Sequence, residues 1–144
     1  MIRRSRAEDV DAIAEVYDRS FATLSFLPML HTLEEHRVWF ARVVDEREVW
    51  VWDEDGLVLG FIALDDAMID YLYVEPELAG RGIGSALLQH AKKQRPAGFS
   101  LWTFQQNEGA RRFYERHGLR VVRLTDGANN EEKTPDALYA WRPG

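Results

Sequence analysis

The sequence contains no cysteine, and this absence removes several classes of function at once. Without cysteine there is no disulfide, no thiol nucleophile and no zinc site built from thiolate ligands. A chain without cysteine suits a reducing compartment, so we expect a cytoplasmic protein.

The sequence also lacks a long apolar run and an excess of basic residues. No stretch approaches the ~20 apolar residues that span a bilayer, and no apolar segment follows the N-terminal arginines as it would in a signal peptide. The chain has 18 basic and 24 acidic residues and a net charge of -6. A nucleic-acid-binding protein needs a basic face that neutralises phosphates. We therefore expect neither a membrane nor a nucleic-acid partner.

What the chain does contain is enough apolar residue to form one core. Its 144 residues are 46% hydrophobic, which predicts a single domain over 1–144. Strand-like runs cover 2–4, 48–52, 57–64, 68–74, 99–104, 119–124 and 137–141, and helical spacing follows Ser5, Thr32, Gly82 and Asn107. This order predicts a mixed α/β (α+β) fold and not the strict alternation of a doubly wound sheet.

Two capping boxes are predicted at the starts of the first two helices. Ser5 pairs with Glu8, and Thr32 pairs with Glu35, each at the spacing in which two side chains satisfy each other's backbone N–H groups. His31 and His36 flank the second box. Because they are five residues apart and a helical ligand pair needs a spacing of four, we predict no metal site there.

Three glycines, Gly80, Gly82 and Gly84, stand directly before a helical segment. The start of a helix carries unpaired N–H groups and a partial positive charge, and glycine lets an anion approach them closely. A Walker loop is excluded because the required lysine is missing. A dinucleotide fingerprint is excluded because its third glycine falls on Ser85 or Leu87, depending on the register.

The segment "AGRGIG" followed by "SALL" resembles the acyl-CoA pyrophosphate loop of the GCN5-related N-acetyltransferases, Arg/Gln-x-x-Gly-x-Gly/Ala. The resemblance extends to "IRRSRAEDVDAIAEVY", which is similar to the family's first strand and helix, and to "NEGARRFYERHGL", which is similar to its fourth helix. Ala79 departs from the pattern, so one side-chain contact to phosphate is missing; Arg81 and Lys92 are the cations expected to compensate. The implied fold is a mixed, mostly antiparallel twisted sheet of about six or seven strands with four helices, in which strands four and five splay apart.

The resemblance also implies roles for individual residues. The backbone of Leu72, Tyr73 and Val74 would pair with the pantetheine arm, and the Val74 N–H would face the acetyl carbonyl. Asn107 would bind the arm, and Tyr114 would protonate the leaving thiolate. The donors to the pyrophosphate would be the N–H groups of Gly80, Arg81, Gly82, Ile83, Gly84 and Ser85. Acetyl-CoA is the implied co-substrate, with no metal.

The implied reaction is acetyl transfer to a primary amine of a small molecule, peptide or protein through a tetrahedral intermediate. A lysine-like amine has a pKa of ~10.4 and is almost entirely charged at pH 7, so a base is needed. The candidates are Asp70, Glu75, His31 and His36. The net negative charge favours a cationic acceptor such as a polyamine, a lysine-like group or an aminoglycoside. Members of the family often dimerise, which leaves a homodimer open.

Simpler interpretations stand beside these. Tyr114 shares a helical stripe with Ala110 and Phe113, which is typical of a core tyrosine, and Asn107 is a good helix N-cap. The chain would then be a non-catalytic acyl-CoA-binding module that does not need Tyr114, or an interaction domain without a CoA site. Saturable CoA binding and thiol release in the presence of amines distinguish these alternatives.

Overall fold

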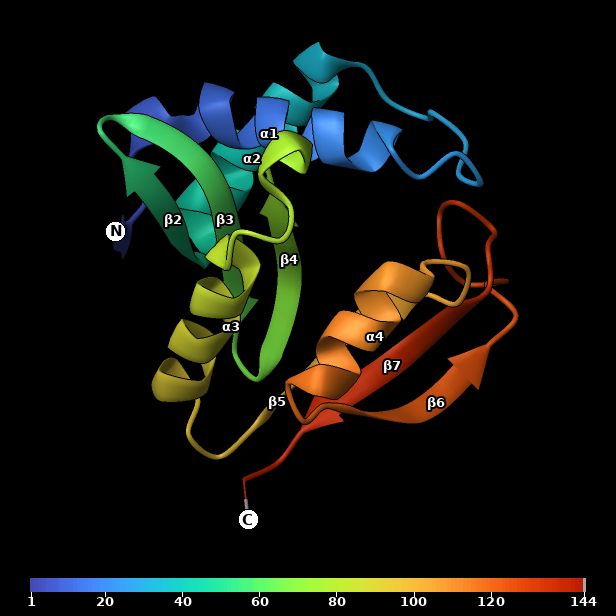
Figure 1. The fold of residues 1–144 in the computed structure, drawn as a ribbon. Helices are drawn as coiled ribbons and strands as arrows, with labels where there is room; N and C mark the ends of the chain where they lie inside the picture. The colour runs from blue at the N-terminus through green and yellow to red at the C-terminus, as the bar shows by residue number, and fades with distance from the viewer. Residues whose placement is uncertain (144) are drawn as a thin grey trace.

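A computed structural model describes residues 1–143 and shows one seven-stranded sheet with helices on both faces (Figure 1). The strands are β1 (Ile2–Arg4), β2 (Glu48–Glu54), β3 (Leu57–Asp65), β4 (Met68–Val74), β5 (Phe99–Phe104), β6 (Arg120–Thr125) and β7 (Asp136–Trp141). The helices are α1 (Val10–Ala22), α2 (Leu33–Glu46), α3 (Ile83–Gln94) and α4 (Glu108–Arg116), with 3-10 turns at Ala7–Asp9 and Pro76–Leu78.

The sheet is antiparallel except at its centre. The strand order is β1-β2-β3-β4-β5-β7-β6, and β4 and β5 run parallel. These two strands pair only at Met68–Ser100 and Ile69–Leu101 and are not paired beyond these residues. The predicted mixed, mostly antiparallel sheet with splayed fourth and fifth strands is therefore confirmed.

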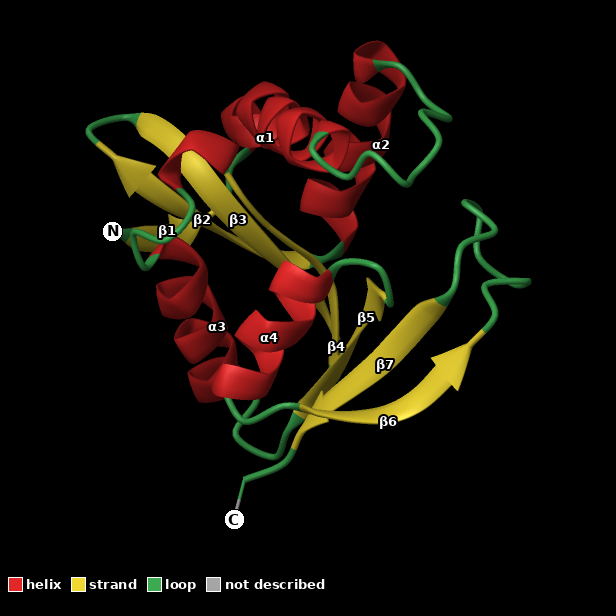
Figure 2. Cartoon of the chain, turned by 45° about the vertical axis from the view of Figure 1, so that its right-hand side comes forward, coloured by secondary structure: helices red, strands yellow, loops and turns green. Residues whose placement is uncertain are grey.

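Alternation of side chains along β3 gives each face of the sheet its own core. Phe61 and Ala63 face α1 and α2, where they contact the fully buried Phe40. Ile62 and Leu64 point the other way and join Leu87 of α3. Figure 2 shows the two pairs of helices on opposite sides of the sheet. Successive residues of a strand face opposite sides, so β3 and β4 contribute side chains to both cores.

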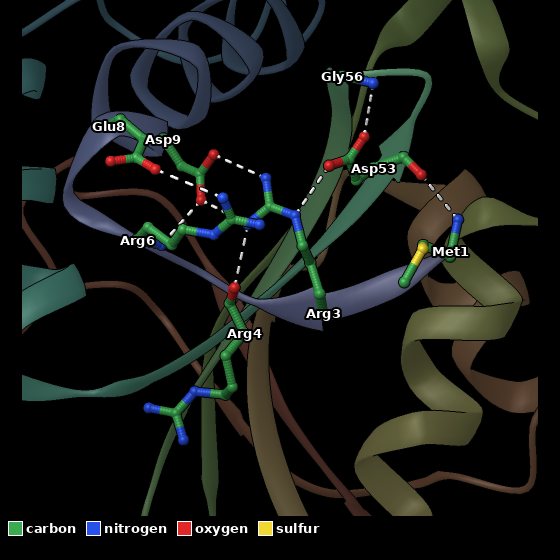
Figure 3. Close-up of polar contacts among 8 residues, drawn as sticks. All are labelled: Met1, Arg3, Arg4, Arg6, Glu8, Asp9, Asp53 and Gly56. Atoms are coloured by element: carbon green, nitrogen blue, oxygen red, sulfur yellow. Dashed lines mark hydrogen bonds and ion pairs between the residues drawn. The ribbon is translucent and has the colours of Figure 1, made fainter.

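The predicted capping box of Ser5 and Glu8 is wrong. The Asp9 carboxylate accepts from the Arg6 N–H at 2.8 Å and binds the Arg3 guanidinium at 2.8 and 2.9 Å (Figure 3). Ser5 follows β1 directly, and its N–H donates to the Val49 carbonyl of β2 at 2.9 Å. The helical turn therefore begins one residue later than the Ser-x-x-Glu spacing predicts.

The second predicted box is confirmed. The Thr32 hydroxyl accepts from the Glu35 N–H at 3.2 Å, and the Glu35 carboxylate accepts from the Thr32 N–H at 2.9 Å. Several strands differ from prediction at their ends: β2 continues to Glu54, β3 continues to Asp65, β6 begins at Arg120 and β7 begins at Asp136. Within residues 1–143, each helix is too short or too polar to cross a bilayer.

Candidate functional site

The main cleft of the molecule lies where β4 and β5 diverge. It is a cavity of about 720 Å³, and residues from both strands line it together with the glycine loop and α4. The predicted residues that line it are Leu72, Tyr73, Val74, Gly80, Gly82, Ile83, Gly84, Ser85, Asn107 and Tyr114. The structure thus brings together residues that are spread over more than forty positions of the chain.

The glycine loop adopts a conformation that other residues rarely reach. Gly80 and Gly82 both have a φ of +86°, in the left-handed region, and Gly82 is the N-cap of α3. The N–H groups of Ile83, Gly84 and Ser85 occupy the first turn, where no carbonyl of the same helix can accept them. Gly84 lies against α4, where an added Cβ would make an ordinary contact of 3.4 Å with the Phe113 ring. The loop therefore presents backbone N–H groups to the cleft.

The cations of this region differ from those expected. The Arg81 N–H donates to the Leu78 carbonyl at 3.3 Å, and Arg81 is not part of the cleft lining. The expectation that Lys92 compensates for Ala79 is wrong: the Lys92 ammonium lies in the last turn of α3 and donates to the His117 carbonyl at 2.6 Å. Arg116 of α4, which sequence reasoning missed, lines the cleft instead.

The Val74 backbone faces the cleft. The N–H of Glu75 donates to the Leu59 carbonyl of β3 at 2.8 Å. Backbone groups of neighbouring strand residues point to opposite sides, so the N–H and C=O of Val74 are directed away from β3. Ser20 of α1 donates its hydroxyl to the Val74 carbonyl at 2.8 Å. The Val74 N–H is thereby left facing the opening between the strands.

Tyr114 places a phenol at the floor of the cleft. Its ring lies 5.5 Å from Phe113 and 6.1 Å from Tyr139, so it is also a packing residue. Burial raises the pKa of Tyr114 to about 12. Among residues 1–143 its hydroxyl has no hydrogen-bond partner, although it belongs to the lining. A phenol that is protonated and not already bonded can donate to a bound molecule.

Asn107 fills two positions at once. Its side-chain oxygen accepts from the Ala110 N–H at 3.2 Å, which confirms the predicted N-cap of α4. The residue also lines the main cleft. Because capping uses only the amide oxygen, the amide NH₂ is left to donate to a ligand.

The four residues considered as bases are all engaged with other charged side chains. Asp70 accepts from Arg47 at 2.6 Å, and Glu75 forms two bonds of 2.7 Å with Arg19. His36 lies 2.9 Å from Asp18, and His31 contacts Glu131, a contact that raises the pKa of His31. Of the four, Asp70 alone lines the main cleft.

A second hollow of about 640 Å³ continues from the main cleft. Trp102, Thr103 and Phe104 of β5 line both spaces. The loop between α1 and α2 and the loop between β6 and β7 meet beside this hollow, through the contact of His31 with Glu131 (Figure 1). The Trp102 side chain is 43% exposed and faces both spaces.

The described residues 1–143 hold no cluster of three or more His, Asp or Glu side chains that is suited to a metal ion. The arrangement consists instead of backbone donors at one end, a phenol on the floor, and an aromatic hollow at the other end. It suits a long ligand that carries an anionic group and lies against the edge of β4.

Comparisons with known proteins agree with this geometry. Residues 45–120 match the family model described as an acetyltransferase (GNAT) domain. The chain is 34% identical over 94 residues to the peptidyl-lysine N-acetyltransferase YiaC of Escherichia coli. The matched residues cover 64% of this chain and 62% of YiaC. It therefore spans less than two thirds of that relative.

A longer match is found with the peptidyl-lysine N-acetyltransferase YjaB of Salmonella typhimurium. The two are 33% identical over 124 residues, which cover 84% of this chain and 83% of YjaB. The solution structure of apo YjaB from Escherichia coli superposes with a TM-score of 0.81 at 27% identity, over 98% of this chain and 96% of that chain.

Proposed function

We propose that this chain, which belongs to the acetyltransferase (GNAT) family, is an acetyl-CoA-dependent N-acetyltransferase whose acceptor is the side-chain amine of a lysine in a peptide or protein. Two features support this acceptor. Two relatives carry the name peptidyl-lysine N-acetyltransferase, and acidic side chains line the second hollow beside the cleft. A lysine amine is one of the cationic acceptors that the sequence favours, beside a polyamine or an aminoglycoside.

The residues of the cleft fit the co-substrate. The unpaired N–H groups of the glycine loop, which include those of Gly82, Gly84 and Ser85, would hold the diphosphate, and Asn107 would donate to the pantetheine arm. The open edge of β4 at Leu72, Tyr73 and Val74 would pair with that arm. Arg116 supports the site with the cation that Ala79 does not provide. The observation that carries the proposal is the splay of β4 from β5, because it exposes a strand edge between the glycine loop and the acidic hollow.

Acetyl-CoA supplies a thioester. The amine nitrogen bonds to its carbonyl carbon to give a tetrahedral intermediate, and the carbon–sulfur bond breaks when that intermediate collapses to the amide. The Val74 N–H donates to the carbonyl oxygen as negative charge develops there. The Tyr114 hydroxyl donates its proton to the departing sulfur and regains one from solvent. The amine must lose a proton before attack, since only about one in a thousand or fewer is neutral at pH 7; the proton leaves to solvent through the open cleft.

Thiol release tests the acceptor. The full chain is mixed with acetyl-CoA and N-terminally blocked lysine peptides, the same peptides with arginine in place of lysine, polyamines or an aminoglycoside. We expect turnover on the lysine peptides and none on the arginine peptides. Turnover on polyamines or the aminoglycoside alone would contradict the proposal. Saturable CoA binding without thiol release for any amine would favour a non-catalytic acyl-CoA-binding module.

The homodimer and the cytoplasmic location expected from the sequence stay predictions. Sedimentation of the full chain at several concentrations measures the first, and localisation of a tagged chain measures the second.

A further inference from the structure

Glu132 lines two neighbouring hollows. Its side chain is half-buried and lines the second hollow together with Trp102 and Phe104. It also lines a small hollow of about 30 Å³ that contains Tyr17 and His31. Figure 1 shows the loop between β6 and β7, which carries Glu132, rising toward the loop between α1 and α2. The carboxylate therefore lies in the region where the two loops border the acceptor end of the cleft.

The other acids of the second hollow already have partners. Asp126 accepts from the Ala128 N–H at 2.9 Å. Asp136 accepts from the Asn130 amide at 3.1 Å and from the Thr125 hydroxyl. These bonds hold the loop in shape, so neither carboxylate is free to change partner without disturbing it.

Glu132 differs from them. Among residues 1–143, its carboxylate forms no hydrogen bond and no ion pair, and only its backbone carbonyl is used, by the Thr134 hydroxyl at 3.0 Å. The neighbouring Glu131 is turned to His31. A half-buried carboxylate without a partner loses part of its hydration and gains nothing in return within the protein. A cationic ligand would supply the missing partner.

The charge of Glu132 reaches the main cleft. It raises the pKa of Tyr73, which lines the cleft on β4, and that of Tyr17, whose ring lies 4.8 Å from Tyr73. In both cases burial is the largest cause and the carboxylate adds to it. Positive charge near the second hollow comes from Arg123, which lines it. Lys133 is turned to the Ala128 carbonyl at 2.8 Å.

We infer that Glu132 is the acceptor-binding carboxylate, which accepts hydrogen bonds from the lysine amine and holds it at the mouth of the cleft against Trp102. The inference rests on the proposed function and names the residue that selects a cationic acceptor. The aliphatic part of the lysine side chain lies along the exposed tryptophan face, and the amine end meets the carboxylate. Glu132 acts in binding, and the proton of the amine leaves to solvent.

The test separates acceptor binding from turnover in the full chain. Glu132→Gln keeps the shape of the side chain and the backbone bond to Thr134, and it removes the charge. We expect the KM for a blocked lysine peptide to rise tenfold or more, kcat to change less than about threefold, and the Kd for CoA to stay within twofold. Glu132→Lys should raise KM further. Glu54→Gln makes the same charge change on the distant β2–β3 hairpin and should leave KM unaltered.

The outcomes are distinguishable. A KM within twofold of the unmodified chain in both Glu132 variants overturns the inference and leaves the lysine acceptor standing. A fall in kcat with an unchanged KM also overturns it, because the carboxylate would then act in proton transfer. If the unmodified chain turns over other amines but not the lysine peptide, the proposed acceptor fails first, and the inference fails with it.

Discussion

Replacing Tyr114 with phenylalanine is the sharpest test of the chemistry in the cleft. The substitution removes one hydroxyl and keeps the ring that lies 5.5 Å from Phe113 and 6.1 Å from Tyr139. Because that hydroxyl has no partner among residues 1–143, its loss leaves no buried group unsatisfied. We therefore expect the melting temperature to change little.

The size of the kinetic effect follows from the hydrogen bond that is lost. Burial raises the pKa of Tyr114 to about 12, so the phenol is protonated at every pH at which the enzyme is assayed. A hydrogen bond to a charged group is worth about 1.5–3 kcal/mol. Each 1.36 kcal/mol corresponds to a factor of about ten. The kcat of Tyr114→Phe should thus fall roughly 10- to 150-fold.

Three measurements define the result. Thiol release gives kcat, calorimetry gives the Kd for CoA, and thermal unfolding reports the fold. Tyr17→Phe is the matched control, since Tyr17 is also a packed tyrosine of raised pKa but does not line the main cleft. In the unmodified enzyme, kcat/KM should rise about tenfold per pH unit from 7 to 9 as the amine loses its proton, and Tyr114 should cause no fall before pH 10. An unchanged kcat in Tyr114→Phe would make Tyr114 a packing residue only.

Three further changes test the loop, its cation and the N-terminal anchor. Gly82→Ala places a side chain at a φ of +86° and should destabilise the fold by about 1–2 kcal/mol and weaken CoA binding. Gly109→Ala, at an open position of α4, should do neither. Equal effects of the two substitutions would refute the role of the left-handed turn. Arg116→Ala should weaken CoA binding about threefold to tenfold, most clearly at low salt; an unchanged Kd would exclude a phosphate contact. Asp9→Asn should cost about 2 kcal/mol in urea unfolding at pH 7, because Arg3 loses a buried partner. Since Arg3 lowers the pKa of Asp9 below 3.8, this difference should shrink as the pH falls below about 4, and a constant difference would contradict the assignment.

Local patterns predicted the fold well because each depends on neighbouring residues. The alternation in Met68–Val74 and Phe99–Phe104 defines β4 and β5 with their observed ends. The Thr32–Glu35 capping box was predicted correctly because both partners lie within one helical turn. The Ser5–Glu8 box failed because Arg3, on the first strand, binds Asp9 and shifts the start of the turn. An ion pair between a strand and a helical turn cannot be predicted from the residue spacing within either element.

The candidate site was predictable where backbone forms it and unpredictable where distant side chains complete it. Gly80, Gly82 and Gly84 indicate a donor loop from their identity alone. Lys92 was wrongly expected at the loop because a helix of twelve residues carries it to the opposite end of α3. Arg116 was missed because it reaches the cleft through the folding of the second half of the chain, and nothing in "ERHG" distinguishes it from a solvated charge.

The open edge of β4 and the glycine loop would recognise the donor through main-chain N–H groups, which every residue type except proline carries. Side-chain drift along β4 would therefore leave the source of the acetyl group unchanged as long as the backbone path is kept. If the two loops that border the second hollow bind the acceptor as proposed, recognition there depends on side chains, and one exchanged residue would alter which amine is modified. Proteins with this fold could therefore change their acceptor while they keep the same acetyl donor.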